Sequence, residues 1–188
     1  LVTSEDNDLT KSITLDYENR LKAIFEDFHA HPELSLAEFE TAKKISAALK
    51  NHGFKVTENV GGTGVVALLE NGRGPLVMMR ADMDGLPLEE KTDLPYASKD
   101  KQLDPVTGNI FPVMHACGHD VHITALIGTA KQMVDLKSEW SGTLMLIAQP
   151  AEERVLGARN MMNDNLWERF GKPDYALAFH VSSMLPSG

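Results

Sequence analysis

The chain has 188 residues, of which 43% are apolar and 24% are charged, and its net charge is -9 at pH 7. These values are ordinary for one soluble globular domain with a sizeable core, and the acidic balance argues against binding to nucleic acid or to an anionic membrane. The single cysteine, Cys117, excludes an internal disulfide. No apolar run is long enough to predict a transmembrane helix.

The amino terminus reads LVTSEDNDLTKS, a polar stretch with neither a methionine nor an apolar signal core. We expect residues 1–14 to be flexible. Such a start is typical of a processed chain, which favours an exported, periplasmic protein over a cytoplasmic one.

Two helices are predicted next. Apolar residues at helical spacing over 16–30 indicate an amphipathic helix that is broken at Pro32. Ser35 and Glu38 match the S-x-x-E capping box and should open a second helix, which Gly53 ends. The inward positions of that second helix would be Leu36, Phe39, Ala42, Ile45 and Leu49.

Beyond Gly53 the pattern changes to short runs rich in β-branched and apolar residues. The predicted strands are FKVTENV, GVVALLE, PLVMMRA, TLMLIAQ and DYALAFHV. Helices are expected over 120–136 and 152–166, and the proline-rich stretch 86–113 should be a long loop or a β-excursion. This alternation predicts an α/β fold, with a mostly parallel twisted sheet and helices on both faces.

Polar clusters follow three of the predicted strands. Asp82 and Asp84 end one strand, Glu152 and Glu153 follow the next, and His180 ends the last. Because reactive groups in such sheets gather at the carboxyl ends of strands, these side chains should lie close together. The simpler alternatives are solvated glutamates, turn-capping aspartates and a core histidine bonded to backbone.

The motif HACGHD places Cys117 and His119 on either side of Gly118. Glycine permits a bend that lets thiolate and imidazole face one point, and both are good ligands for zinc, nickel, cobalt or manganese. The alternatives are a buried cysteine beside a satisfied histidine, or a cysteine nucleophile activated by histidine. Three further histidines are not assigned as metal ligands: His31, His115 and His122.

Five motifs, HPELS, RADMDGLP, MHACGHD, QPAEE and a late strand ending in histidine, occur in this order between residues 31 and 180. Together they resemble the metal-dependent aminoacylase/carboxypeptidase family. The similarity is to its amidohydrolase branch, which includes hippurate hydrolases, N-acyl-amino-acid amidohydrolases and auxin-conjugate hydrolases. The resemblance implies a partial zinc-peptidase-like catalytic domain over 15–188.

The resemblance also implies roles for individual residues. The metal ligands would be Cys117, His119, Glu153 and His180, and they would hold two divalent ions, with zinc or manganese favoured and cobalt or nickel possible. Glu152 matches the general base of the family. Asp82 aligns with an aspartate near the metals in the wider family and is included with Glu152 among the catalytic residues.

The implied reaction is hydrolysis of the amide bond of a small N-acyl amino acid. A dipeptidase or carboxypeptidase of the same family, or an inactive metal-binding fragment, is the alternative. The family's second domain, which makes dimer contacts, and its last histidine ligand would follow residue 188. The chain therefore corresponds to the amino-terminal half of such an enzyme, and the complete enzyme would be a homodimer.

Overall fold

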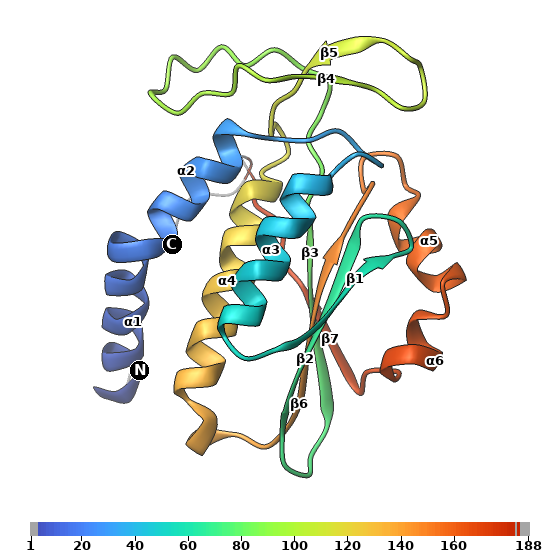
Figure 1. Ribbon diagram of the computed structural model, residues 1–188. Coiled ribbons are helices and arrows are strands. Elements are labelled where there is room, and N and C mark those ends of the chain that lie inside the picture. The colour runs from blue at the N-terminus through green and yellow to red at the C-terminus, as the bar shows by residue number, and fades with distance from the viewer. Residues whose placement is uncertain (1–3, 183, 185–188) are drawn as a thin grey trace.

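The computed structural model describes residues 4–182 and 184, and Figure 1 shows a central sheet with helices on both sides. The helical elements are α1 (Ser4–Asp16), a π-helical turn (Tyr17–Leu21), α2 (Lys22–Ala30), α3 (Phe39–Asn51), α4 (His119–Asp135), a 3-10 turn (Lys137–Glu139), α5 (Gly157–Asn163) and α6 (Leu166–Phe170). The strands are β1 (Lys55–Val60), β2 (Gly64–Asn71), β3 (Leu76–Asp82), β4 (Lys101–Leu103), β5 (Ile110–Pro112), β6 (Gly142–Gln149) and β7 (Tyr175–Ala178). Within the described residues, no helix has the length and apolarity to cross a bilayer.

The main sheet has the strand order β1-β2-β6-β3-β7. β3 runs parallel to β6 and to β7, whereas β2 is antiparallel to β1 and to β6. The predicted α/β class with helices on both faces is confirmed, but the sheet is mixed rather than mostly parallel. β2 turns back from β1 at Gly61 and Gly62, whose positive φ angles suit a tight turn, and so short a turn joins antiparallel strands.

Each face of the sheet has its own apolar core. On one face α2, α3 and α4 bury Phe28, Ile45 and Leu126 against the strands, and on the other face α5 and α6 bury Met161 and Leu166. In Figure 1 these two sets of helices lie to the left and to the right of the sheet. A fully buried aliphatic or aromatic side chain contributes about 1.5–3 kcal/mol, so the two cores hold the strand ends firmly in place.

The second predicted helix is present as α3, with Ala42, Ile45 and Leu49 buried as expected. Its first turn differs from the prediction. Phe39 is 64% exposed instead of inward, and Leu36 lies before the helix with a φ of 71°. The predicted helix therefore begins about one turn too early in the sequence, because α3 starts only at Phe39.

The capping box assigned to Ser35 and Glu38 is wrong. The Glu33 carboxylate instead accepts hydrogen bonds from the backbone N–H groups of Glu40, at 3.2 Å, and Thr41, at 2.7 Å. A carboxylate suits this position because the first N–H groups of a helix lack partners within the helix. The side chains of Ser35 and Glu38 are thus released for contacts elsewhere in the molecule.

One other segment differs from the predicted pattern. The helix expected over 152–166 begins only at Gly157, because the residues before it form turns in which Ala151 and Val155 have positive φ angles. The polar amino-terminal stretch is helical from Ser4 as α1, residues 1–3 lie outside the described part, and the flexibility expected over 1–14 stays a prediction.

The stretch 86–113 contains the antiparallel hairpin β4–β5, as the predicted β-excursion requires. Figure 1 shows this hairpin beyond the upper end of the main sheet. The Gln102 side chain ties it to the loop before α3, accepting a hydrogen bond from the Leu34 N–H at 2.5 Å and donating one to the Ala37 carbonyl at 3.0 Å.

Candidate metal centre

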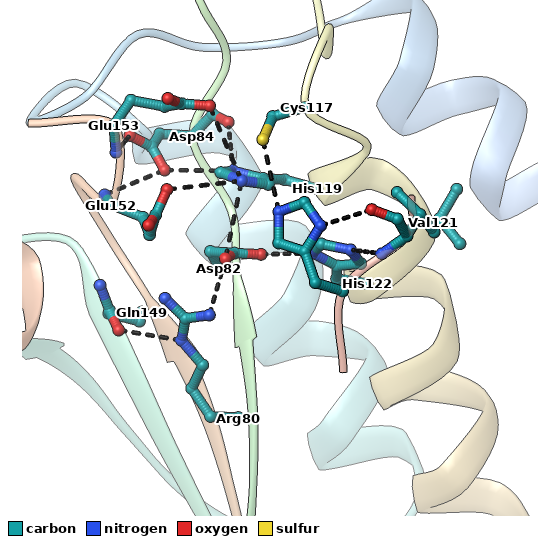
Figure 2. A network of polar contacts seen from close by, with 12 residues as sticks. Arg80, Asp82, Asp84, Cys117, His119, Val121, His122, Gln149, Glu152 and Glu153 are labelled. Carbon is teal, nitrogen blue, oxygen red and sulfur yellow. Dashed lines mark hydrogen bonds and ion pairs between the residues drawn. The ribbon is translucent and has the colours of Figure 1, made fainter. Parts of the chain in front are cut away.

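The predicted site residues meet at one edge of the sheet. The carboxyl ends of β3 and β6, the segment after β7 and the first turn of α4 converge there, and Figure 2 shows their polar side chains. Gly118 makes the bend into α4 with a φ of 79°, and a Cβ at this position would lie 2.3 Å from Cγ2 of Val181. Glycine is therefore required both by the backbone conformation and by the close approach of a neighbouring segment.

His119 is the centre of the cluster and is fully buried. Its Nδ1 donates to the Asp84 carbonyl at 2.8 Å, so in the neutral ring Nε2 carries the lone pair. Nε2 lies 3.6 Å from Asp82 Oδ2, 3.7 Å from Glu152 Oε2 and 3.8 Å from Glu153 Oε1. These separations are too long for hydrogen bonds but suit groups that share a cation.

Among the described residues, three sets of side chains have the donor atoms and spacing to hold a metal ion, and His119 belongs to all three. The sets are Cys117, His119 and His180; Asp82, His119 and His122; and His119, Glu152 and Glu153. Sulfur, imidazole and carboxylate donors together suit zinc and related divalent ions.

Two unpaired atoms support the fit of a metal ion. His119 Nε2 and Glu153 Oε1 are buried, face each other at 3.8 Å, and have no hydrogen-bond partner among the described residues. A buried nitrogen and a buried oxygen left unpaired cost free energy unless something binds them. A divalent cation satisfies both, so the residues present fit the metal.

The side of the site near β7 is more open. Cys117 is partly buried, and its Sγ lies 3.4 Å from Nε2 of the exposed His180. His180 Nδ1 donates to the Val181 carbonyl at 2.6 Å, which leaves Nε2 free to face the sulfur. Burial, together with the charges of Glu153 and Glu152, raises the pKa of the Cys117 thiol to about 11. A thiolate therefore needs a bound cation here, and this disfavours the alternative of a cysteine nucleophile.

Asp82 is fully buried and both of its carboxylate oxygens are bonded. Oδ1 accepts a 2.5 Å hydrogen bond from His122 Nδ1, and Oδ2 accepts one of 2.7 Å from Arg80, as Figure 2 shows. Burial raises the pKa of Asp82, but the His122 hydrogen bond and the charges of His119 and Arg80 outweigh it and lower the pKa to about 2. Arg80 is in turn fixed by Gln149, whose side-chain carbonyl accepts from its Nε at 2.9 Å.

His122 is oriented from both sides. Its Nε2 accepts a hydrogen bond from the Val181 N–H at 3.0 Å, so Nδ1 must carry the proton that it donates to Asp82. Both ring nitrogens are thus bonded within the protein. His122 is also a member of one of the three candidate ligand sets, although in this structure its ring bonds Asp82 and Val181.

Asp84 connects the two strand ends. Its Oδ1 and Oδ2 accept hydrogen bonds from the backbone N–H groups of Glu152 and Glu153, each at 3.1 Å, and Oδ2 also accepts from the Ser35 hydroxyl at 2.6 Å. Asp84 therefore holds the backbone of both glutamates and, through its own carbonyl, His119.

The structure brings together all six residues singled out from the sequence: Asp82, Cys117, His119, Glu152, Glu153 and His180. The unassigned histidines differ from one another. His31 is exposed and bonds the Asp27 carbonyl, away from the cluster. His115 is buried with neither ring nitrogen bonded to the described residues. Burial lowers the pKa of His115 to about 4.

Sequence reasoning missed the supporting contacts of Arg80, Gln149 and Ser35, because each joins residues that local spacing does not relate. One signal was available for His122. It follows His119 by three residues on α4, and residues at this spacing lie on the same face of a helix.

The fold and the cluster together define a metallohydrolase-like α/β domain. The family model of peptidase family M20/M25/M40 matches residues 78–188, and the chain belongs to this family.

Relatives support the same assignment. The chain is 41% identical over 167 residues to a hippurate hydrolase from Campylobacter jejuni, covering 88% of this chain and 40% of that protein. It is also 41% identical over 148 residues to an N-acetyl-L-cysteine deacetylase from Bacillus subtilis, covering 78% and 33%.

Among solved structures, the Bacillus subtilis YXEP protein, described as a dinuclear metal binding peptidase of the M20 family, is similar with a TM-score of 0.78 and 37% identity. The match covers 90% of this chain and 44% of that one. The chain thus spans between 33% and 44% of the length of these proteins.

Proposed function

We propose that this chain is part of a metal-dependent amidohydrolase that cleaves the amide bond of small N-acyl amino acids. The observation that carries the proposal is the unpaired buried couple of His119 Nε2 and Glu153 Oε1, with the Glu152 carboxylate beside it. The names of the relatives, a hippurate hydrolase and an N-acetyl-L-cysteine deacetylase, support this substrate class.

Cys117, His119, Glu153 and His180 would hold two divalent ions, with zinc or manganese favoured over cobalt and nickel. When bound, the metal pair supplies Lewis acidity to the scissile carbonyl and to the attacking water. The acidic surroundings favour a cation: burial lowers the pKa of His119, but the hydrogen bond to Asp84 and the charges of Asp82, Asp84 and Glu153 outweigh it and raise the pKa.

Glu152 would be the general base. Its side chain is 37% exposed while its backbone N–H is held by Asp84, so the carboxylate can reach both the cluster and an incoming substrate. It would take the proton of the attacking water and deliver it to the leaving nitrogen, so that the amide C–N bond breaks and a free amine and a carboxylic acid result.

Asp82, expected from the resemblance to be catalytic, has both oxygens committed to His122 and Arg80. We therefore assign it a positioning role, in which it fixes the His122 ring and contributes negative charge near His119. Proton transfer is left to Glu152. By the family resemblance, the longer protein would be a homodimer.

The test compares the wild-type chain with Glu152→Gln, each loaded with zinc or manganese. Metal content is measured by elemental mass spectrometry, and hydrolysis of hippurate and N-acetylcysteine by release of free amine. We expect close to two ions per chain in both proteins, and turnover reduced by about 10²–10⁴ in the variant, the usual contribution of a general base. Full activity of Glu152→Gln would overturn the assignment of the base.

A second candidate is a non-catalytic metal-binding unit. It is favoured by the chain covering only 33–40% of the two curated relatives, because substrate contacts in those proteins can come from the remainder. Metal binding at full stoichiometry with no hydrolysis of either compound would select this candidate.

A further inference from the structure

The turn that carries the two glutamates has an unusual first residue. Ala151 is fully buried and has a φ of 46°, in the left-handed region that residues with a side chain rarely adopt. Such a conformation persists only where the surroundings hold it. Because Glu152 and Glu153 follow directly, the backbone at Ala151 decides where both carboxylates point.

Glu38 holds this residue from a distant part of the chain. Its side chain is completely buried, its Oε1 accepts a hydrogen bond from the Ala151 N–H at 2.7 Å, and its Oε2 accepts one from the Thr63 hydroxyl at 2.6 Å. Glu38 precedes α3 and Thr63 lies in the turn between β1 and β2. One carboxylate therefore joins three separate segments behind the metal cluster.

The burial of this carboxylate is costly. Both hydrogen-bond donors to Glu38 are uncharged, and desolvation raises its pKa although the bonds from Thr63 and Ala151 oppose that change. A buried acid without a cationic partner is expensive to keep in an apolar interior. An apolar side chain would be less costly at this position. The hydrogen bond from Glu38 to the Ala151 N–H explains why an acid is found there instead.

Glu38 and Asp84 together bind the backbone N–H groups of three successive residues. Asp84 accepts from the N–H groups of Glu152 and Glu153, but not from that of Ala151, which Glu38 holds. Three successive backbone N–H groups are thus fixed by two buried carboxylates from different segments. The turn continues to Val155, which also has a positive φ angle, and α5 begins only at Gly157.

We propose that Glu38 is a positioning residue for the metal centre: by holding the Ala151 amide, it fixes the directions of the Glu152 and Glu153 side chains. The inference rests on the proposed function, because it assigns Glu38 a part in that same site. It acts through the backbone and does not contact the metal or the substrate.

The test uses two substitutions of the same residue. Glu38→Gln keeps a side-chain carbonyl for the Ala151 N–H and an amide that can donate to the Thr63 oxygen. Glu38→Met fills similar space but has no hydrogen-bond acceptor of comparable strength. Zinc affinity is measured by isothermal titration calorimetry on the 188-residue chain. We expect Glu38→Met to weaken zinc binding by about 10–100-fold, as loss of an outer partner of a ligand does, and Glu38→Gln to bind nearly as the wild type.

Leu49→Ala is the matched control. Leu49 is fully buried on the helix that follows Glu38, and its truncation destabilises the fold without touching the turn. Its zinc affinity should equal that of the wild type, which separates positioning from general loss of stability. Equal zinc affinity in wild type and Glu38→Met would overturn the inference alone, whereas a wild-type chain that binds no zinc would overturn the proposed function as well.

A second measurement does not depend on the folding of any variant. Hydrogen exchange of the wild-type backbone, followed by NMR, reports directly on the three amides. Ala151, Glu152 and Glu153 should exchange as slowly as the core strands, because their N–H groups are bonded to carboxylates. Fast exchange at Ala151 would mean that Glu38 does not hold it, and would reject the inference.

Discussion

The metal cluster has two sides that are built differently. The buried wall, consisting of Asp82, Asp84, His119 and His122, is at most 5% exposed. The open rim, consisting of Cys117, Glu152, Glu153 and His180, is partly or largely accessible, with Glu152 and Glu153 side chains 37% and 19% exposed. Wall side chains are bonded to other parts of the protein at almost every polar atom, whereas rim side chains point their donor atoms into the site.

This difference indicates that the two sides are ordered by different forces. The wall is assembled by folding, because hydrogen bonds between protein groups alone join β3, the turn after β6 and α4. The rim brings like charges together and is stabilised chiefly by what binds there. Substitutions in the wall should therefore lower stability, and substitutions in the rim should change metal binding or turnover with little effect on stability.

The largest effect on stability is expected for Asp82→Ala. Removing this carboxylate leaves Arg80 and His122 without their buried partner, which typically costs about 3–5 kcal/mol. Urea unfolding followed by circular dichroism measures the loss. Lys43→Ala, which removes an exposed ion pair with Glu40, is the control and should change stability by less than about 1 kcal/mol. Similar losses of unfolding free energy in the two variants would contradict the expectation that the buried contacts of the wall stabilise the fold more than an exposed ion pair does.

His119→Ala tests the residue that connects wall and rim. Because His119 belongs to all three candidate ligand sets, zinc affinity should fall by more than the roughly 10–100-fold typical of an outer partner. Calorimetric titration with zinc measures the change, and the exposed His31→Ala serves as the control with unchanged affinity. A His119→Ala chain that bound zinc normally would contradict the proposed centre.

His180→Ala probes the rim by itself. The side chain is exposed and belongs to only one ligand set, so zinc affinity should fall by more than the roughly 10-fold that loss of an outer partner costs, but by less than for His119→Ala. Stability of the metal-free chain should stay within about 0.5 kcal/mol, as for other surface substitutions. Urea unfolding measures the stability, and calorimetric titration with zinc measures the affinity. A large loss of stability would show that the rim is also needed for folding.

The smallest expected effect is a pH dependence of stability that comes from His29 and its two acidic partners, Asp120 and Glu90. Buried His29 bonds Asp120 at 2.6 Å and Glu90 at 2.9 Å. Burial lowers the pKa of His29, but these hydrogen bonds and charges outweigh it and raise the pKa above its ordinary value of 6.5. The folded state thus binds the proton more tightly than the unfolded state.

The contribution of charged His29 should be fully present below pH 6.5 and should be lost as the pH rises through the raised value in the folded protein. The stability difference between wild type and His29→Gln, measured by urea unfolding from pH 6 upward, should therefore shrink. A difference that stayed constant would mean that His29 is neutral in the fold. Leu49→Ala, which removes a buried side chain without a titratable group, is the control and should show no such trend.

Local sequence spacing was sufficient for most of the elements and for the polar residues that meet in the candidate cluster. Alternation of apolar runs predicted the α/β class, and the polar residues after β3, β6 and β7 were expected to meet because parallel strands end at one edge. HACGHD indicated the bend at Gly118 correctly, since a left-handed residue between two donors is a local property of the backbone. Strand order and the antiparallel β2 were not foreseen, because pairing depends on contacts between distant segments.

The sequence by itself therefore determined which residues carry the donor atoms and at which edge of the sheet they gather. Only the tertiary structure decided what each supporting side chain bonds. Ser35 and Glu38 matched a helix cap by spacing, yet their partners are Asp84, 49 residues away, and Ala151, 113 residues away. Buried polar groups bond whichever donor the packed fold brings near them, and this choice depends on the packing of the whole domain.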